Sequence, residues 1–372
     1  MISTQAAGSF EAAGDARAPR PLAPAPAPAP LRGAAVFSDV SWIARDLAGA
    51  ASKELAAAAD PACADVLWTQ RPVGDYGALN FRAANRLPFE HCLVTKHRLA
   101  ATLRAAFGSR PLRSRGDDAA GSGGRDWYHP ATYELRCGAE ALAALRHAEA
   151  HPGAWWISKP RAGSRGQGVR VDASLAPALA VDEACPRVAQ RYVRDVALYR
   201  GRKFDVRFLV LVRRLEGDAL CGRLWRDFWV RVARDAYGGD PSRRTAHLTA
   251  MHLVAPATFD ASANPTAAEF REFYESATGG RWSDALSRVR ALARDVLAAG
   301  AARCPGFATA AAEGPPRRAA VYGIDVLFDR DWTPVLLEVQ FDPVPKPGLD
   351  GAALLAGLLL DDDATSDDLF GD

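Results

Sequence analysis

The sequence lacks the cysteine patterns that build disulfide frameworks or zinc sites. Its six cysteines are scattered along 372 residues, with no CxxC pair and no Cys/His cluster at the spacing of zinc ligands. This excludes a small disulfide-bonded domain and a structural zinc domain, and it indicates a reducing compartment. We therefore expect a cytoplasmic protein.

A long apolar run and an excess of charge of one sign are also missing. No apolar run is long enough to span a membrane, and the net charge is only +2, from 46 Lys and Arg against 44 Asp and Glu. We therefore expect neither a membrane nor a nucleic acid as partner, and any electrostatic site must be local.

Familiar catalytic signatures are absent as well. The sequence has no Walker loop of the form GxxxxGK[ST], and it has no Ser/His/Asp or Cys/His nucleophile arrangement. The seven histidines are dispersed, and we interpret them as structural or surface groups.

What the chain does have is enough apolar content for a globular fold. Hydrophobic residues make up 49% of the sequence, and the length suggests two or three packed subdomains. Residues 1–33 are rich in Ala and Pro and are expected to be disordered. Residues 361–372 are acidic and are expected to be disordered too.

Apolar periodicity predicts several helices between these tails. Thr95 is the expected N-cap of one of them, and the stretches 110–125 and 308–318 are expected to be loops. The predicted helices span residues 37–51, 96–107, 137–151, 267–278, 282–300 and 351–360.

A hairpin near the C-terminus is the first candidate site. Residues 322–328 and 334–341 read as two apolar strands joined by a polar turn, and each strand buries one carboxylate, Asp325 and Glu338. Facing carboxylates, with the amide of Gln340 on the same strand face, suit a hard cation such as Mg²⁺. An equally weighted alternative is that both acids form buried ion pairs with arginines.

A second candidate site is a glycine-rich loop that follows a strand ending in Lys159. Residues 161–168 read R-A-G-S-R-G-Q-G and lead into a further strand. Backbone amides of such a loop can approach phosphate oxygens, and the basic side chains supply charge. A simple turn remains the alternative reading of a lone glycine-rich hairpin.

A third candidate site is a strand whose charges alternate with apolar residues. Lys203, Asp205 and Arg207 share one face of this strand, which continues into a fully apolar run. The charged face is either solvated or lines a cleft, and the apolar continuation favours the cleft. A later aromatic strand, residues 225–232, carries Arg231 near its end.

Taken together, these motifs closely resemble the tubulin–tyrosine ligase-like family, and most of all the branch typified by its member twelve. The resemblance covers residues 85–343. It rests on the ordered motifs W-I-S-K-P, S-R-G-Q-G, Q-R-Y-V, G-R-K-F-D-V-R, F-W-V-R, H-L-T, Y-G-I-D-V-L and L-L-E-V-Q.

The resemblance implies an α+β or α/β fold of ATP-grasp architecture. Residues 34–151 would form an N-terminal subdomain, and residues 152–360 the central and C-terminal ATP-grasp subdomains. It implies ATP and Mg²⁺ as cofactors, a free amino acid as substrate, and tubulin or microtubules as partner. We expect a monomer that acts in the cytoplasm, with the cytoskeleton or a cilium as further locations.

The resemblance also implies a role for each candidate residue. Arg207, Arg231 and Glu338 would be catalytic, and Asp325, Glu338 and Gln340 would bind the metal. The nucleotide-binding residues would be Lys159, Arg165, Gly166, Gly168, Gln190, Arg191, Tyr192, Val193, Lys203 and Asp205.

Two departures from the family pattern keep a second function open. Gln340 stands where the family has an asparagine, and Ala250 stands where an asparagine usually follows the H-L-T motif. Either change favours a pseudoenzyme that binds nucleotide and tubulin, or another partner, without ligation. The intact basic residues and carboxylates favour an active ligase, and a ligase of small molecules is a third reading.

Overall fold

The computed structural model describes part of the chain, and all statements below refer to that part. The described residues are 34–40, 43–44, 55–59, 61–69, 83–85, 87, 89–108, 129–161, 166–180, 185–214, 220–250, 263–304, 307, 317–341, 343, 354 and 366–369.

A ten-stranded sheet forms the centre of the molecule, in the order β14-β11-β10-β12-β4-β3-β1-β2, with β9 and β13 attached to β10 and β12. The pairs that involve β1 to β4 are parallel, whereas those among β10 to β14 are antiparallel. Its strands are β1 (Ala34–Ser38), β2 (Leu55–Ala57), β3 (Val66–Trp68), β4 (Ala83–Asn85), β9 (Leu198–Tyr199), β10 (Arg202–Arg214), β11 (Leu220–Val232), β12 (Arg317–Phe328), β13 (Pro334–Phe341) and β14 (Ser366–Asp368).

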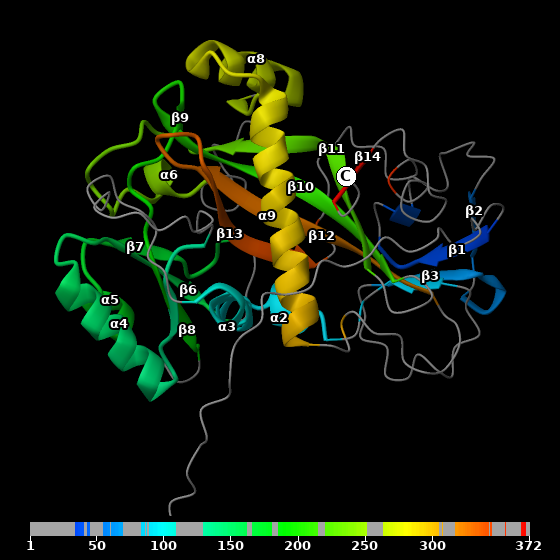
Figure 1. Cartoon of the computed structure of the whole chain (residues 1–372), viewed down its shortest axis with the longest axis horizontal. Coiled ribbons are helices and arrows are strands. Elements are labelled where there is room, and N and C mark those ends of the chain that lie inside the picture. Colours follow the sequence, from blue (N-terminus) through cyan, green and yellow to red (C-terminus); the bar gives the residue numbers. More distant parts are fainter. Residues whose placement is uncertain are drawn as a thin grey trace, which may run out of the picture.

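A smaller, antiparallel sheet has the order β5-β8-β6-β7. With α4 and α5 it lies at one end of the molecule, and the parallel strands β1 to β3 lie at the other (Figure 1). Its elements are β5 (Thr132–Glu134), α4 (Gly138–Ala150), β6 (Trp156–Pro160), β7 (Arg170–Asp172), α5 (Ala176–Leu179) and β8 (Arg187–Arg191).

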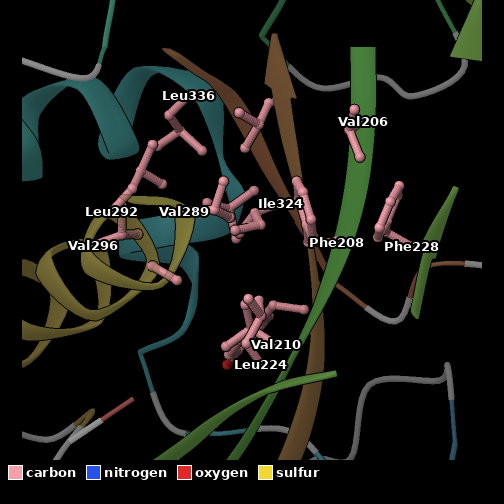
Figure 2. Close-up of a cluster of buried hydrophobic side chains, with 14 of the residues drawn as sticks. Val206, Phe208, Val210, Leu224, Phe228, Val289, Leu292, Val296, Ile324 and Leu336 are labelled. Atoms are coloured by element: carbon pink, nitrogen blue, oxygen red, sulfur yellow. The ribbon is translucent and has the colours of Figure 1, made fainter. Parts of the chain in front are cut away.

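The long helix α9 covers the larger sheet and buries its main core. Val289, Leu292 and Val296 of α9 meet apolar side chains of β10, β12 and β13, as Figure 2 shows. Spacings of three and four residues place these three on one helix face. Helix α9 spans Trp282–Arg303. The remaining helical elements outside the smaller sheet are η1 (Pro61–Cys63), α2 (His91–Val94), α3 (Lys96–Phe107), α6 (Arg244–His247) and α8 (Ala267–Thr278).

One face of strand β10 is apolar from Phe204 to Val212. The other face is charged up to Arg207 and apolar at Leu209 and Leu211. Phe204, Val206 and Phe208 face the core under α9. On the opposite face, Leu209 and Leu211 join a second apolar cluster with β1, β3 and β11. The charged stretch that precedes Leu209 on that face is buried as well, so the alternative of a solvated face is wrong and the cleft stays a prediction.

Several predicted elements are confirmed, and their ends have clear local causes. Helices α3 and α8 have the predicted bounds. In α8 the Thr266 and Glu269 side chains form a capping box. The β12–β13 turn is set by Asp329, whose Oδ1 accepts hydrogen bonds from the backbone amides of Asp331 (3.0 Å) and Thr333 (2.8 Å).

Other expectations are wrong or lie outside the described residues. Phe37 and Ser38 belong to strand β1, not to a helix, because β1 pairs with β2 and β3. Strand β12 begins at Arg317, within the loop expected at 308–318. The stretch 110–125 and all of the predicted helix at 351–360 except Leu354 lie outside the described residues.

The predicted subdomain boundary stays a prediction, whereas the predicted C-terminal disorder needs correction. Strand β5 precedes residue 151 yet pairs with β8 after it, and β4 pairs with β12, so strand pairing crosses that boundary. In the acidic tail, Ser366–Asp368 forms β14 on the edge of β11, because backbone pairing and the buried Leu369 side chain hold it there.

Within the described residues, no helix combines the length and the apolar character needed to cross a membrane.

Candidate functional site

Four neighbouring strands of the larger sheet carry charged side chains at matching positions. Arg231 of β11 lies opposite Asp205 of β10. Arg207, two residues further along β10, lies opposite Asp325 of β12, which in turn lies opposite Glu338 of β13. Since residues two apart on a strand share a face, strand register brings these five side chains together. We call them the charged row.

Most of the charged row is joined by short ion pairs. Arg207 binds Asp325 through two hydrogen bonds, from Nε to Oδ1 (2.6 Å) and from Nη2 to Oδ2 (2.7 Å). Arg231 bridges two carboxylates, with Nε at 2.5 Å from Asp205 Oδ1 and Nη2 at 2.7 Å from Asp325 Oδ2. The Thr249 hydroxyl donates to the other oxygen of Asp205. For Asp325, the ion-pair alternative left open by the sequence is therefore what the structure shows.

The two arginines determine the protonation of Asp325. Burial alone would raise the pKa of this carboxyl group, but Arg207 and Arg231 overcome that effect and hold the pKa below its ordinary value. Burial likewise opposes the charge of Arg231, yet Asp205 and Asp325 raise the pKa of that guanidinium. Asp325 and Arg231 therefore each favour the charged form of the other.

Glu338 has a different environment from Asp325. Gln340 Nε2 donates to Glu338 Oε1 at 2.5 Å, and Lys96 Nζ lies 3.8 Å from the other carboxylate oxygen. The side chain of Glu338 is partly exposed. This end of the charged row is therefore the part that a ligand can reach most easily.

The oxygen donors at this end fit a hard cation. Carboxylates of Asp325 and Glu338 with the amide oxygen of Gln340 are the donor types that Mg²⁺ prefers. Within the described residues no group of three or more His, Cys, Asp or Glu side chains is placed to hold a metal ion, so an amide has to complete this set. Asp325 would have to give up an arginine contact to contribute an oxygen.

The smaller sheet presents a buried lysine to the charged row. Lys159 Nζ donates to Gln190 Oε1 at 2.8 Å, and Gln190 Nε2 donates to Thr132 Oγ1 at 2.8 Å. Burial lowers the pKa of Lys159, with Glu338 as the largest opposing influence and Lys96 acting in the same direction as burial. These influences place Lys159 in the electric field of the charged row.

The two sheets meet at this point. A small enclosed cavity of about 10 Å³ is lined by Lys159 and Gln190 of the smaller sheet and by Leu337 of β13. The predicted phosphate-binding lysine and the predicted metal hairpin therefore approach one another from opposite sheets.

The glycine-rich loop lies next to Lys159 and requires glycine. Gly166 and Gly168 have φ angles of 67° and 65°, which other L-residues rarely adopt. A Cβ at Gly168 would lie 3.1 Å from Pro160 Cγ, and Arg187 donates to the Gly168 carbonyl oxygen. Arg165, the predicted phosphate contact of this loop, lies outside the described residues.

The predicted adenine segment, Gln190 to Val193, covers the last two residues of β8 and the two that follow it. Arg191, Tyr192 and Val193 line an open pocket of about 710 Å³, and the Tyr192 amide donates to the Trp155 carbonyl oxygen at 2.8 Å. Lys203 Nζ donates to the Tyr192 hydroxyl at 2.7 Å. Burial lowers the pKa of Lys203 to about 7, against the influence of Asp205.

Sequence reasoning missed three residues of this region. Lys96 was assigned only to a helix, and Thr132 had no motif around it. His247 was set aside with the other histidines, although it begins the H-L-T motif. The structure buries His247 against the hydroxyl of Tyr192, at 2.9 Å from Nδ1, so its place in that motif was the signal to follow.

The arrangement suits chemistry on a polyanion. Four basic side chains, Lys159 of the smaller sheet and Lys203, Arg207 and Arg231 of the larger one, lie near the carboxylates of the charged row. Phosphoryl transfer needs little covalent participation by the protein, and it depends on positioning and on cations near the transferring group.

Comparison with known proteins agrees with this geometry. Residues 77–362, most of the chain, match the family model described as the tubulin-tyrosine ligase family. The matched range includes every residue of the charged row, the glycine-rich loop and the segment after β8. A search of curated proteins found no match.

Proposed function

Because the chain belongs to the tubulin-tyrosine ligase family, we propose that it is an ATP-dependent ligase that joins an amino acid to a protein carboxylate, with tubulin as the acceptor. The family implies an ATP-grasp-like fold and ligase-type activity, and the mixed sheets and helices agree with that fold. The observation that carries the proposal is the charged row on one sheet facing Lys159 on the other.

The nucleotide would bind where the two sheets meet, with its adenine in the open pocket of about 710 Å³. Lys159 and the loop residues Arg165, Gly166 and Gly168 would hold its phosphates. The segment from Gln190 to Val193 would receive the adenine, and Lys203 and Asp205 would contact the nucleotide from β10.

The proposed reaction has two steps. The acceptor carboxylate attacks the γ-phosphate and forms an acyl-phosphate with release of ADP; the amine of the amino acid then attacks the acyl carbon, and an amide forms with release of phosphate. Arg207 and Arg231 would stabilise the negative charge of the transferred phosphoryl group. Bound Mg²⁺, held by Asp325, Glu338 and Gln340, would supply further neutralisation of the phosphates.

A pseudoenzyme that binds nucleotide and a partner without ligation is the second candidate. Three observations favour it: both Asp325 oxygens are bound by arginines, Gln340 replaces the shorter amide, and Ala250 offers no polar group. The ligase reading is preferred because the charged row and Lys159 retain every charge that the reaction requires.

The test is incorporation of labelled tyrosine, glutamate or glycine into microtubules with Mg-ATP. The matched control is Glu338→Ala, which removes the most accessible carboxylate of the charged row. Label that appears with the native protein and disappears in the variant supports the ligase and identifies the amino acid. No label with any amino acid, together with a melting temperature raised by Mg-ATP, would reject ligation in favour of the pseudoenzyme.

A further inference from the structure

A buried chain of hydrogen bonds connects His247 to Lys203. Lys203 Nζ lies 2.7 Å from the Tyr192 oxygen, and that oxygen lies 2.9 Å from His247 Nδ1. On the far side, His247 Nε2 lies 2.8 Å from the backbone carbonyl oxygen of Asp240. The three side chains come from β10, from the segment after β8 and from α6, so the chain of contacts joins both sheets to the segment that follows β11.

The backbone carbonyl fixes the direction of every proton in this chain. A carbonyl oxygen can only accept, so His247 Nε2 must carry the hydrogen. Burial lowers the pKa of His247, although the hydrogen bond to the Asp240 carbonyl oxygen acts in the opposite direction. A neutral ring that carries its hydrogen on Nε2 leaves Nδ1 as an acceptor. The Tyr192 hydroxyl therefore donates to His247, and its oxygen is left to accept from Lys203.

Aromatic rings surround these three hydrogen-bonded side chains and shield them from water. The ring centroids of Trp155 and Tyr237 lie 5.7 Å and 5.2 Å from that of His247, both edge-to-face. Lys203 Nζ also lies 4.0 Å from the centroid of the Tyr192 ring. In a buried network each polar group needs its partner, so a substitution of His247 should alter the position of the Lys203 amine.

We propose that His247 is a positioning residue of the nucleotide site, which acts through the Tyr192 hydroxyl to hold Lys203 for the nucleotide. Without this acceptor, Lys203 would turn toward Asp205, the carboxylate that shares its strand face and is already bound by Arg231 and Thr249. The inference deepens the proposed function and rests on it. A purely structural role for His247 would affect stability alone.

The test measures ATP affinity by calorimetry in the full-length chain. His247→Gln removes the acceptor near Nδ1, whereas His247→Asn keeps an acceptor there. Tyr192→Phe removes the hydroxyl that links the two ends. Tyr274→Phe is the matched control, since the Tyr274 hydroxyl accepts from Arg288 Nη2 and takes no part in the hydrogen bonds between His247, Tyr192 and Lys203.

We expect His247→Gln and Tyr192→Phe each to weaken ATP binding about tenfold, because each breaks the hydrogen bonds that hold Lys203 in place. His247→Asn should restore most of the affinity, and Tyr274→Phe should leave it unchanged. In the Tyr192→Phe background, His247→Gln should have no further effect. Additive losses, or native affinity in His247→Gln, overturn the inference.

A second measurement needs no nucleotide. Long-range ¹⁵N–¹H spectra of the ligand-free protein should show His247 as the Nε2–H tautomer, with an Nδ1 shift that changes in Tyr192→Phe. The opposite tautomer, or an unchanged shift, overturns the relay. A native protein that binds no ATP defeats the proposed function and the inference together, whereas ATP binding that is indifferent to His247 defeats the inference alone.

Discussion

Arg231 joins two ion pairs of the charged row. It contacts two carboxylates on different strands, Asp205 and Asp325. Arg207 binds the same Asp325. Buried ions of this kind are tolerated only as a set, since each one alone would carry the full cost of leaving water. A change of one member should therefore affect stability as well as function.

Asp325→Asn should lower the free energy of unfolding by about 3–5 kcal/mol, the usual loss when one partner of a buried ion pair is removed. Both arginines would then face a neutral amide. Glu338→Gln, at the partly exposed end of the charged row, should cost about 1 kcal/mol or less. Urea unfolding of both variants checks this, and equal losses would contradict the burial argument.

Lys203 should make nucleotide binding depend on pH. Burial lowers the pKa of Lys203 to about 7, so its amine is largely neutral at pH 8 in the ligand-free protein. A bound polyphosphate favours the ammonium form and raises that pKa. ATP binding at pH 8 should therefore take up protons, and uptake should fade below the ligand-free pKa.

Calorimetry in two buffers of different ionisation enthalpy measures this proton uptake directly. Lys203→Met is the informative variant, because it removes the titrating group and keeps an unbranched side chain. Full proton uptake in that variant would assign the effect to another group.

At the scale of elements, local signals were sufficient for helices and hairpins. The bounds of α8 follow from its capping box, and the β12–β13 hairpin follows from its turn residues. Strand β1 could not be predicted, because its partners β2 and β3 are parallel strands and leave no local pattern. The sequence could not decide whether Asp325 binds a metal ion or an arginine, because both arrangements need a buried carboxylate. The strand register that places Arg207 opposite Asp325 cannot be read from the sequence of either strand.

Strand β12 requires a glycine at position 323. A Cβ there would lie 3.0 Å from Pro343 Cβ and 3.4 Å from Arg207 Cδ. Gly323→Ala should push against Pro343 and cost about 1–3 kcal/mol through overpacking. Urea unfolding measures this loss. Gly138→Ala, at a helical position with open space around it, is the control and should be neutral or slightly stabilising.

At the scale of the whole molecule, the two sheets and the C-terminal strand form one connected body. β14 covers the edge of β11, with Leu369 buried and Arg290 donating to the Asp368 carbonyl oxygen at 2.6 Å. The acidic composition of the tail suggested disorder. Composition alone could not reveal that one apolar residue, Leu369, would anchor the tail. The family resemblance was visible in the sequence because its motifs lie on the strands that build the cleft.

Removal of residues 366–372 should lower the melting temperature and promote self-association, since it exposes the backbone of an edge strand. Thermal unfolding and light scattering at several protein concentrations check this expectation. Leu369→Ala tests the anchor alone and should cost about 1.5–3 kcal/mol at most. A truncated protein that stays monomeric and equally stable would show that β14 contributes nothing to the fold.

The bridge made by Arg231 has a consequence for ionic strength. Because its guanidinium is already neutralised by Asp205 and Asp325, an arriving triphosphate exchanges one set of ion pairs for another and displaces few dissolved ions. ATP affinity should therefore change little between low and high KCl, unlike that of a cleft lined by solvated cations. Affinity measured across a KCl series would show this insensitivity, and Asp205→Asn should make the same site salt-sensitive.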